Sequence, residues 1–386
     1  MKKTLALALV LLVCLSVFAQ GGKEAAAPAA ETTKIGFVVI GDENDQGYTY
    51  NFMNGMNAAI AQLKAEGYDV SLSVKRNIKE DAGCVDANLA LAAEGCSIIF
   101  DNSYGFEQYM QQAADEFPNI KFISLTNCGS QIDGRDNTSN AFARIYEGRY
   151  IAGVAAGMKL QEMVDSGKIK ADQAVIGYVG AFSFAEVVSG MSAYYLGARS
   201  VCPSATMLVS FVGSWSDPTL EAEAAQSLID RGAKMISQHS DNTTPATTAQ
   251  KNGVFHTGYN NDMTKVAPNA SLLSCRIDWT KYFHDFIQNE IEGKDNPHDY
   301  IGTMAHGEVV VTELNTAIAA PGTAEAMEKA EKALADGSLE VFDLSKFTVN
   351  GKTATNADLY DSFAAVQGDA IHDGAFHESE LQSAPY

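Results

Sequence analysis

The sequence has few basic residues for its length. It contains 27 Lys and Arg against 48 Asp and Glu, which gives 386 residues a formal net charge of −21. Nucleic-acid binding needs a basic surface that neutralises phosphates, so the composition argues against nucleic acid as a partner. The same acidity disfavours association with anionic membrane surfaces. Because 46% of the residues are hydrophobic, the chain can still build real cores.

The common catalytic motifs are also missing. There is no G-x-S-x-G elbow, no Walker loop, no H-E-x-x-H motif and no G-x-G-x-x-G after the first predicted strand. His239-Ser240-Asp241 holds the residue types of a catalytic triad, but adjacent residues do not converge as a triad requires. His372-Asp373 and His377-Glu378 have loose metal-ligand character, and a solvated tail is the preferred interpretation. We therefore expect no enzyme activity, no cofactor and no metal site.

Cysteine is scarce and scattered. Beyond the N-terminal segment there are five, Cys84, Cys96, Cys128, Cys202 and Cys275, and none forms a Cys-x-x-Cys pair. An odd, widely spaced set argues against a zinc knot or a redox motif. Small buried thiols are the preferred interpretation, and one disulfide in an oxidising compartment is the alternative.

The N-terminal segment has the pattern of a secretory signal peptide. A basic start, Met1-Lys2-Lys3, precedes an apolar run from Thr4 to Ala19 that is too short for a confident membrane span. Val17-Phe18-Ala19 matches a small-x-small cleavage site. We therefore expect residues 1–19 to be a signal peptide and residues 20–33 to be a flexible leader.

Export would place the mature chain in the periplasm or outside the cell. Cys14 leaves a second possibility, because bacterial lipoproteins carry a lipid-modified Cys after a Leu-x-small segment. Leu11-Leu12-Val13-Cys14 matches that segment poorly, since Val13 is not small and the apolar run continues. Soluble export is the preferred prediction, and lipid anchoring to the membrane is the alternative.

After the leader, short β-rich runs alternate with helical patterns. This alternation predicts an α/β fold with parallel sheets and right-handed crossovers, and the length predicts two domains. The polar stretch at 127–140 is predicted to be a connecting loop, and a largely buried helix is predicted at 145–160. The strand–helix pattern starts again at 174–180, which indicates a second α/β unit of similar length.

The two units define the expected lobes. Lobe 1 is predicted to span residues 34–155 and lobe 2 residues 156–271. The strand predicted at 272–277 is expected to return the chain to lobe 1, so that residues 272–305 rejoin that lobe and residues 306–386 rejoin lobe 2.

Aromatic residues gather where the predicted strands end. The turn at 41–50 follows a strand at 34–40 and leads into a helix. In open α/β sheets such turns lie at the carboxyl ends of strands, where ligands bind. Five rings at positions of this kind suggest a stacking slot for a flat ligand. They are Tyr48, Tyr104, Phe182, Trp215 and Trp279.

Carboxylates and amides occupy the same turns. They include Asp42, Asp45, Asp101, Asn102, Asp241 and Asp262. A carboxylate can accept from two hydroxyls of a sugar or from the N–H groups of a base. For each acid alone a helix cap is the alternative interpretation, and Asp45 is the clearest case. Export and a cleft between two lobes together predict a binding protein that closes around a small ligand.

Several segments carry a family resemblance in their order along the chain. They are residues 179–180, 213–218, 232–236, 238–241 and 258–263, together with the turn at 41–50 and residues 147–153. They resemble the basic membrane lipoprotein family, the substrate-binding proteins of ATP-driven (ABC) importers. The resemblance covers about residues 34–300.

The resemblance implies a type I periplasmic-binding fold, with two doubly wound parallel-sheet lobes joined by a hinge, and a membrane permease as partner. In the best-understood branch, the purine nucleoside receptors, one ring from each lobe sandwiches the base, and acids hold the ribose and the base edges. By this resemblance Tyr48 is the first ring and Asp45 the acid beside it. Phe182, or less favourably Phe184, is the second ring, and Asp262 is the acid that grips the sugar.

Two features depart from the nucleoside receptors. Those proteins carry a Lys after the late strand, where this chain has Arg276-Ile277-Asp278-Trp279, and the motifs at Trp215 and 238–241 resemble a sibling branch. We therefore expect a purine-like ligand, with a free nucleobase slightly favoured over a nucleoside. A flavin, or the sugar or autoinducer of a sensor with the same fold, is the alternative. An exported nucleoside hydrolase is a third hypothesis, and the sequence lacks the acid–base constellation that it needs.

Overall fold

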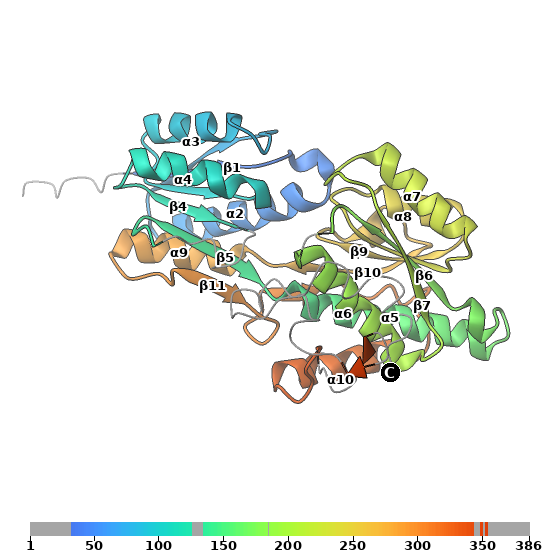
Figure 1. Cartoon of the computed structure of the whole chain (residues 1–386). Helices are drawn as coiled ribbons and strands as arrows, with labels where there is room; N and C mark the ends of the chain where they lie inside the picture. Colours follow the sequence, from blue (N-terminus) through green and yellow to red (C-terminus); the bar gives the residue numbers. More distant parts are fainter. Residues whose placement is uncertain (1–31, 126–133, 184, 343–347, 350–351, 354–386) are drawn as a thin grey trace, which may run out of the picture.

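Two six-stranded sheets, each covered by helices, organise the chain into two lobes that lie side by side (Figure 1). The computed structural model describes residues 32–125, 134–183, 185–342, 348–349 and 352–353. The predicted signal peptide, the histidine pairs near residues 372–378, Cys14 and Cys128 lie outside these residues.

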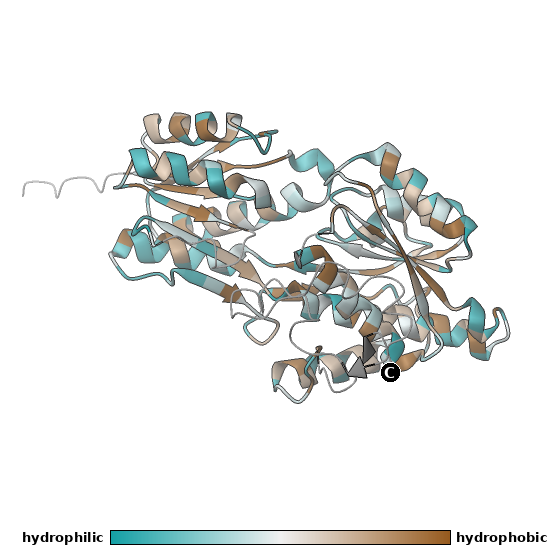
Figure 2. Ribbon diagram, viewed as in Figure 1, coloured by the Kyte–Doolittle hydropathy of each residue, from teal (hydrophilic) through white to brown (hydrophobic). Residues whose placement is uncertain are grey.

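The first sheet has the strand order β11-β5-β4-β3-β1-β2, and every neighbouring pair is parallel. Its strands are β1 (Thr33–Val38), β2 (Val70–Lys75), β3 (Ile98–Asp101), β4 (Lys121–Ser124), β5 (Thr138–Ala143) and β11 (Asp299–Gly302). The helices of this lobe are α2 (Tyr48–Ala65), α3 (Gly83–Ala93), α4 (Glu107–Glu116) and α9 (Thr280–Glu292). The strands are short and largely apolar, as expected where helices cover both faces of a parallel sheet (Figure 2).

The second sheet has the order β12-β10-β9-β8-β6-β7 and is parallel except for the antiparallel pair of β10 and β12. Its strands are β6 (Val175–Gly180), β7 (Thr206–Phe211), β8 (Met235–His239), β9 (Phe255–Tyr259), β10 (Ser271–Ile277) and β12 (Val309–Val311). The helices of this lobe are α5 (Ile145–Asp165), α6 (Ala185–Val201), α7 (Pro218–Asp230) and α8 (Thr244–Lys251). Helix α10 (Thr323–Ala335) packs against α5, and β13 (Thr348–Val349) pairs with β14 (Lys352–Thr353).

Within the described ranges the chain passes between the lobes three times: after β5, after β10 and between β11 and β12. The expected return of residues 272–277 to lobe 1 is wrong, because β10 pairs with β9 in the second sheet. The chain returns to lobe 1 only after β10, through α9 and β11. Helix α5 also belongs with lobe 2, since it packs against α6, so the first passage comes near residue 144 and earlier than the expected boundary at 155.

The loop predicted at 127–140 differs from the structure at its end, where Thr138 begins β5. The start of this strand is polar and gives no β pattern. It is held by its neighbours, because Asn140 Nδ2 donates to Asp299 Oδ1 of β11 at 2.8 Å. A long-range contact of this kind cannot be inferred from local sequence.

The described cysteines, Cys84, Cys96, Cys202 and Cys275, are buried and unpaired, which confirms the expected buried thiols for these four. None of the helices in the described part of the chain is both long enough and apolar enough for a membrane span.

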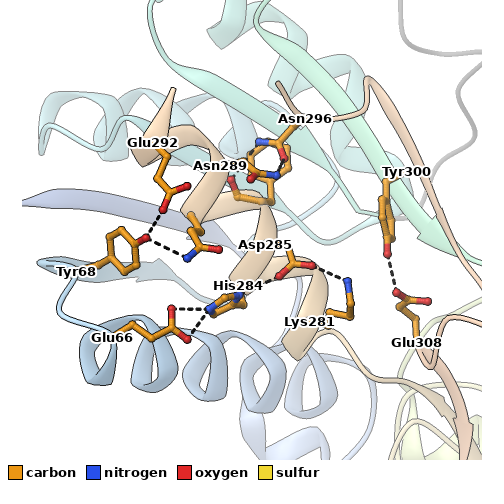
Figure 3. Close-up of polar contacts among 12 residues, drawn as sticks. Glu66, Tyr68, Lys281, His284, Asp285, Asn289, Glu292, Asn296, Tyr300 and Glu308 are labelled. Atoms are coloured by element: carbon orange, nitrogen blue, oxygen red, sulfur yellow. Dashed lines mark hydrogen bonds and ion pairs between the residues drawn. The ribbon is translucent and has the colours of Figure 1, made fainter. Parts of the chain in front are cut away.

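Helix α9 is fastened by polar contacts to the segment that directly follows α2 (Figure 3). The ring of His284 lies between two carboxylates, with Nε2 at 3.0 Å from Glu66 Oε2 and Nδ1 at 2.9 Å from Asp285 Oδ1. Tyr68 donates a short hydrogen bond to Glu292. Burial alone would lower the pKa of His284, but the two carboxylates outweigh burial and raise it above the ordinary value of 6.5.

The contacts of His284 with Glu66 and Asp285 predict a pH-dependent contribution to stability. A raised folded-state pKa means that the His284 contacts stabilise the protein fully below about pH 6.5 and lose that effect as the pH rises through the folded pKa. We expect His284→Gln to lower the free energy of unfolding by less than about 1 kcal/mol, since both carboxylates are partly exposed. The loss, measured by urea unfolding, should be larger at pH 6 than at pH 8.5. An equal loss of unfolding free energy at both pH values would show that these contacts do not depend on the charge of His284.

Candidate functional site

A pocket lies between the lobes, at the carboxyl ends of strands from both sheets. Eight of the described residues line it: Ile40, Tyr48, Ser103 and Tyr104 from the first lobe, and Glu186, Trp215, His239 and Asp241 from the second. Its empty volume is about 290 Å³. Four of the predicted site residues, Tyr48, Tyr104, Trp215 and Asp241, therefore meet in one pocket.

The two lobes touch beside the pocket. A Cβ atom placed on Gly47 would lie 2.1 Å from the carbonyl oxygen of Asp241 and 3.3 Å from the backbone N of Asn242. Only a glycine allows this approach of one backbone to the other. The pocket is correspondingly narrow. The structure therefore has the lobes closed on each other.

Tyr48 forms the wall of the pocket in the first lobe. It begins α2, and its hydroxyl donates to the carbonyl of Asn102 at 2.6 Å. Burial first, and then the carboxylate of Glu186, raises the pKa of Tyr48 well above 10, so the hydroxyl stays neutral. One edge-to-face contact with Phe52, 4.9 Å between ring centroids, fixes the ring from behind.

Asp45 lies beside Tyr48 and caps α2. Its carboxylate accepts from the backbone N–H groups of Gly47 at 2.9 Å, Thr49 at 2.7 Å and Tyr50 at 3.1 Å. The cap interpretation is therefore confirmed for this residue. Burial raises the pKa of Asp45 although the three N–H donors oppose that shift. Asp45 thus fixes the turn that presents Tyr48 and adds negative charge near the pocket.

Asn102 lies behind Tyr48 at the end of β3. Its Oδ1 accepts from the backbone N of Ile40 at 3.0 Å, so its side chain ties the turns after β1 and β3 together. Its buried Nδ2 has no hydrogen-bond partner among the residues the structure describes. Asn102 thus supports the wall of the pocket without lining it.

The second lobe contributes a pair of aromatic rings. Trp215, in the turn after β7, lines the pocket, and Phe182 packs against it edge to face with 5.1 Å between ring centroids. The Trp215 carbonyl accepts from the backbone N of Asp241 at 2.8 Å, which ties this turn to the end of β8. Trp215 therefore lines the pocket from the second lobe as Tyr48 does from the first, and Phe182 packs against Trp215 without lining the pocket. Phe184 lies outside the described residues.

Asp241 is a buried carboxylate at the pocket wall. Only 5% of its surface is exposed, and within the described chain its side chain makes no hydrogen bond. Burial first, and then the charges of Asp45 and Glu221, raises the pKa of Asp241 well above its ordinary range. A buried acid without a donor is costly, so this group is available for a ligand that brings one.

The sequence-based prediction missed four further lining residues: Ile40 and Ser103 in the first lobe, and Glu186 and His239 in the second. His239 Nε2 lies 3.0 Å from Glu186 Oε1, and the Tyr259 hydroxyl donates to the same oxygen at 3.3 Å. Burial lowers the pKa of His239, so the ring is neutral and its Nε2–H donates to Glu186. Both residues follow the strand-end rule, since His239 ends β8 and Glu186 lies in the first turn of α6 after β6.

Arg149 lies behind this pair, fully buried in α5. Its Nη1 donates to the carbonyl of Gln238 at 2.7 Å, and its guanidinium lies 3.8 Å from the centroid of the Tyr259 ring. This cation–π contact and the backbone hydrogen bond occupy Arg149 behind the pocket, and it does not line the pocket wall.

Two predicted site residues lie away from the pocket. Trp279 is 2% exposed and packs in the core of the first lobe, stacked on Phe52 with 4.5 Å between centroids. Asp262 caps the short helix after β9, where its Oδ1 accepts from Thr264 N at 3.1 Å. Neither lines the pocket. No cluster of metal-ligating side chains occurs in the ranges the structure covers.

Comparisons with known proteins agree with this architecture. The family of PnrA-like ABC transporter substrate-binding proteins matches residues 32–339. A purine-binding protein of Brucella abortus is 34% identical over 268 residues, 69% of this chain and 71% of that protein. A putative ABC transporter glucose-binding protein of Haloferax volcanii is 34% identical over 216 residues, 56% of this chain, and the chain spans only 51% of that relative.

A solved structure shows the fold. The ABC transporter solute-binding protein of Aeropyrum pernix K1 superposes with a TM-score of 0.64 at 12% identity, covering 91% of this chain and 99% of that one. This likeness confirms the expected periplasmic-binding type of α/β fold. The family match covers most of the chain, so the expected membership is confirmed too: the chain belongs to the PnrA-like family of ABC transporter substrate-binding proteins.

Proposed function

We propose that this protein captures a purine-like ligand, a nucleobase or a nucleoside, for its ABC importer. The observation that carries the proposal is the pocket itself, in which Tyr48 of one lobe and Trp215 of the other are lining residues together with the carboxylates of Glu186 and Asp241. Two rings that approach from opposite lobes suit a flat heterocycle, because each face of the ligand then meets a ring. The purine-binding relative from Brucella supports the same ligand class.

Capture is proposed to proceed by closure of the lobes. In an open form the ligand would stack on Tyr48 or Trp215, and closure would bring the second ring onto its other face while the acids accept from its edge. Burial and stacking would each contribute on the order of one to a few kcal/mol per ring. The closed protein would then deliver the ligand, chemically unchanged, to a membrane permease. We propose that residues 1–19 direct the export that this role needs.

A sugar is the second candidate, because the relative from Haloferax is named a glucose-binding protein. Sugar sites also pair rings with carboxylates, and the hydroxyls of a sugar would suit Glu186 and Asp241. A sugar has no extended flat π face, however, and would use the facing rings less well than a purine.

A thermal-shift screen tests the function. Purified protein, unfolded and refolded to remove any retained ligand, would be screened against nucleobases, nucleosides, flavins and sugars. A purine at about 100 times its Kd is expected to stabilise the protein by roughly 2.7 kcal/mol. For a folded chain of this size that should raise the melting temperature by about 4 °C. A shift with glucose and none with purines would overturn the proposal in favour of the sugar.

Two variants show whether the shift arises in the pocket. Trp215→Ala removes the second ring and should reduce the purine shift strongly. Phe211→Ala is the matched control, because Phe211 is an aromatic of the same lobe that is 37% exposed and does not line the pocket. Equal shifts in both variants would exclude Trp215 as a stacking residue.

A further inference from the structure

We propose that the pocket selects among flat heterocycles by their N–H donors: Glu186 and Asp241 accept from amino groups on the ligand's edge, and together they reject ligands with an anionic edge. This inference rests on the proposed function and narrows its ligand class to uncharged, amino-bearing purines such as adenine.

The first observation is the set of open acceptors. Glu186 uses Oε1 for His239 and Tyr259, while its Oε2 has no partner among the described residues. The carboxylate of Asp241 makes no hydrogen bond in the same part of the chain. Both side chains are about 95% buried and both line the pocket. The pocket wall therefore presents at least two carboxyl groups with oxygens open to a ligand, and in its ionised form each group accepts hydrogen bonds without donating any.

The second observation is the lack of a cation on the pocket wall itself. Among the described residues, the lining contains neither Lys nor Arg, and its one histidine is kept neutral by burial. The buried charge of Arg149 interacts with Glu186 from behind the wall, where the Gln238 carbonyl and the Tyr259 ring hold the guanidinium away from a ligand. On the first lobe Glu80 accepts from Ser103, itself a lining residue, and so adds a further carboxylate.

These two observations lead to a preference of the pocket for ligands that present N–H donors. An N–H that points at a carboxylate forms a charge-assisted hydrogen bond, roughly twice as strong as a neutral one. A carbonyl or carboxylate of the ligand at the same place would face an acceptor with no proton to share, and the buried acid would stay unpaired. The raised pKa of Asp241, caused by burial and neighbouring acids, agrees with a charge that is costly until a donor reaches it. Sites built for a donor discriminate sharply against analogues that lack it.

The test compares four ligands of nearly equal size by isothermal titration calorimetry on the refolded full chain. Adenine carries the amino group, purine lacks it, hypoxanthine replaces it with an oxo group and purine-6-carboxylate replaces it with an anion. We expect adenine to bind at least about tenfold more tightly than purine or hypoxanthine, which corresponds to one charge-assisted hydrogen bond. Purine-6-carboxylate should bind at least about a hundredfold more weakly than adenine.

Two isosteric variants test the residues. Glu186→Gln and Asp241→Asn each turn one acceptor oxygen into an NH₂ donor, so each should lower the preference for adenine over hypoxanthine about tenfold. Glu223→Gln is the matched control, because Glu223 is exposed on α7 of the same lobe and the change of net charge is the same. Melting curves would establish that each variant folds, and Asp241→Asn carries the test if Glu186→Gln does not fold.

The outcomes separate this inference from the proposed function. If purines bind but hypoxanthine equals or exceeds adenine, or if both variants keep the parent's preference, the inference is overturned and purine capture stands. If none of the four ligands binds and no nucleoside shifts the melting temperature either, both are overturned. A preference for adenine that falls in the two variants and stays in the control supports the assignment.

Discussion

Replacing Gly153 with alanine is expected to destabilise this protein by at least about 3 kcal/mol, the range of severe overpacking. The direction of this change in stability is what makes the variant informative. In a helix interior alanine is normally favoured over glycine by roughly 1 kcal/mol, and Gly153 lies in the middle of α5. Helix propensity therefore predicts the opposite result.

The reason is the close approach of α5 and α6 in the core of the second lobe. A Cβ on Gly153 would lie 2.0 Å from the carbonyl oxygen of Tyr194, and one on Gly197 would lie 2.1 Å from that of Tyr150. Gly157 meets the Ala198 carbonyl in the same way at 2.3 Å. The obstructing atoms are backbone, so no side chain can rotate away. The two helices would have to separate and open the core that they share.

Urea unfolding of Gly153→Ala measures the effect, with Gly190→Ala as the matched control. Gly190 lies in α6, and a Cβ there would come no closer than 3.4 Å to the side chain of Arg149, an ordinary contact. The control should therefore unfold near the parent's midpoint. A urea midpoint for Gly153→Ala at or above the parent's would show that the helices tolerate separation and would refute the close-packing argument.

Local sequence was enough to predict most elements of the fold. The strand predicted at 174–180 is β6 at Val175–Gly180, and the helix predicted to begin at residue 145 begins there as α5. Apolar runs and helical periodicity are local signals, so element types and approximate bounds follow from them. Which sheet a strand joins is decided by long-range pairing. The run at 272–277 is apolar enough for either sheet, and its sequence could not show that β10 pairs with β9.

The wrong sheet assignment of β10 explains one of the mistakes in the predicted site. Trp279 follows a strand end, but the chain passes to the other lobe directly after β10, which places Trp279 against Phe52 in the first core. Asp262 shows a different limit, because an acid that caps a helix and an acid that faces a pocket look alike in sequence. Glu186 was missed for the converse reason. It is the kind of residue that usually caps or solvates a first helical turn, and only the fold turns it toward His239.

Replacing Gly47 with alanine is expected to weaken purine binding by at least about a hundredfold, or roughly 2.7 kcal/mol. The added Cβ would lie 2.1 Å from the carbonyl oxygen and 2.6 Å from the carbonyl carbon of Asp241, which belongs to the opposite lobe. Two non-bonded heavy atoms cannot approach so closely, so the lobes would stop short of the closed arrangement. Tyr48 and Trp215 would then be held too far apart to stack on both faces of one ligand.

The change should act on closure and little on folding, because the obstructing atom lies across the cleft. The hydrogen bond from the Gly47 N–H to the Asp45 carboxylate uses only backbone atoms of Gly47, so it is kept. Gly83→Ala is the matched control, since a Cβ there would meet only the Asp81 carboxylate on the surface, at 3.0 Å. Calorimetry gives the affinity of both variants, and small-angle X-ray scattering with and without adenine gives their compaction.

Affinity and compaction together decide how the ligand is held. If Gly47→Ala binds weakly and does not compact on adding adenine, while Gly83→Ala behaves as the parent does, the contact between Gly47 and Asp241 marks the closed state that captures the ligand. If Gly47→Ala keeps the parent's affinity, the bound lobes lie further apart than in this structure. A cleft held wider would bring water to Glu186 and Asp241 and weaken their preference for amino groups, because an exposed carboxylate can be solvated when the ligand offers no donor. The adenine-to-hypoxanthine ratio of Gly47→Ala therefore reports how far selectivity depends on closure.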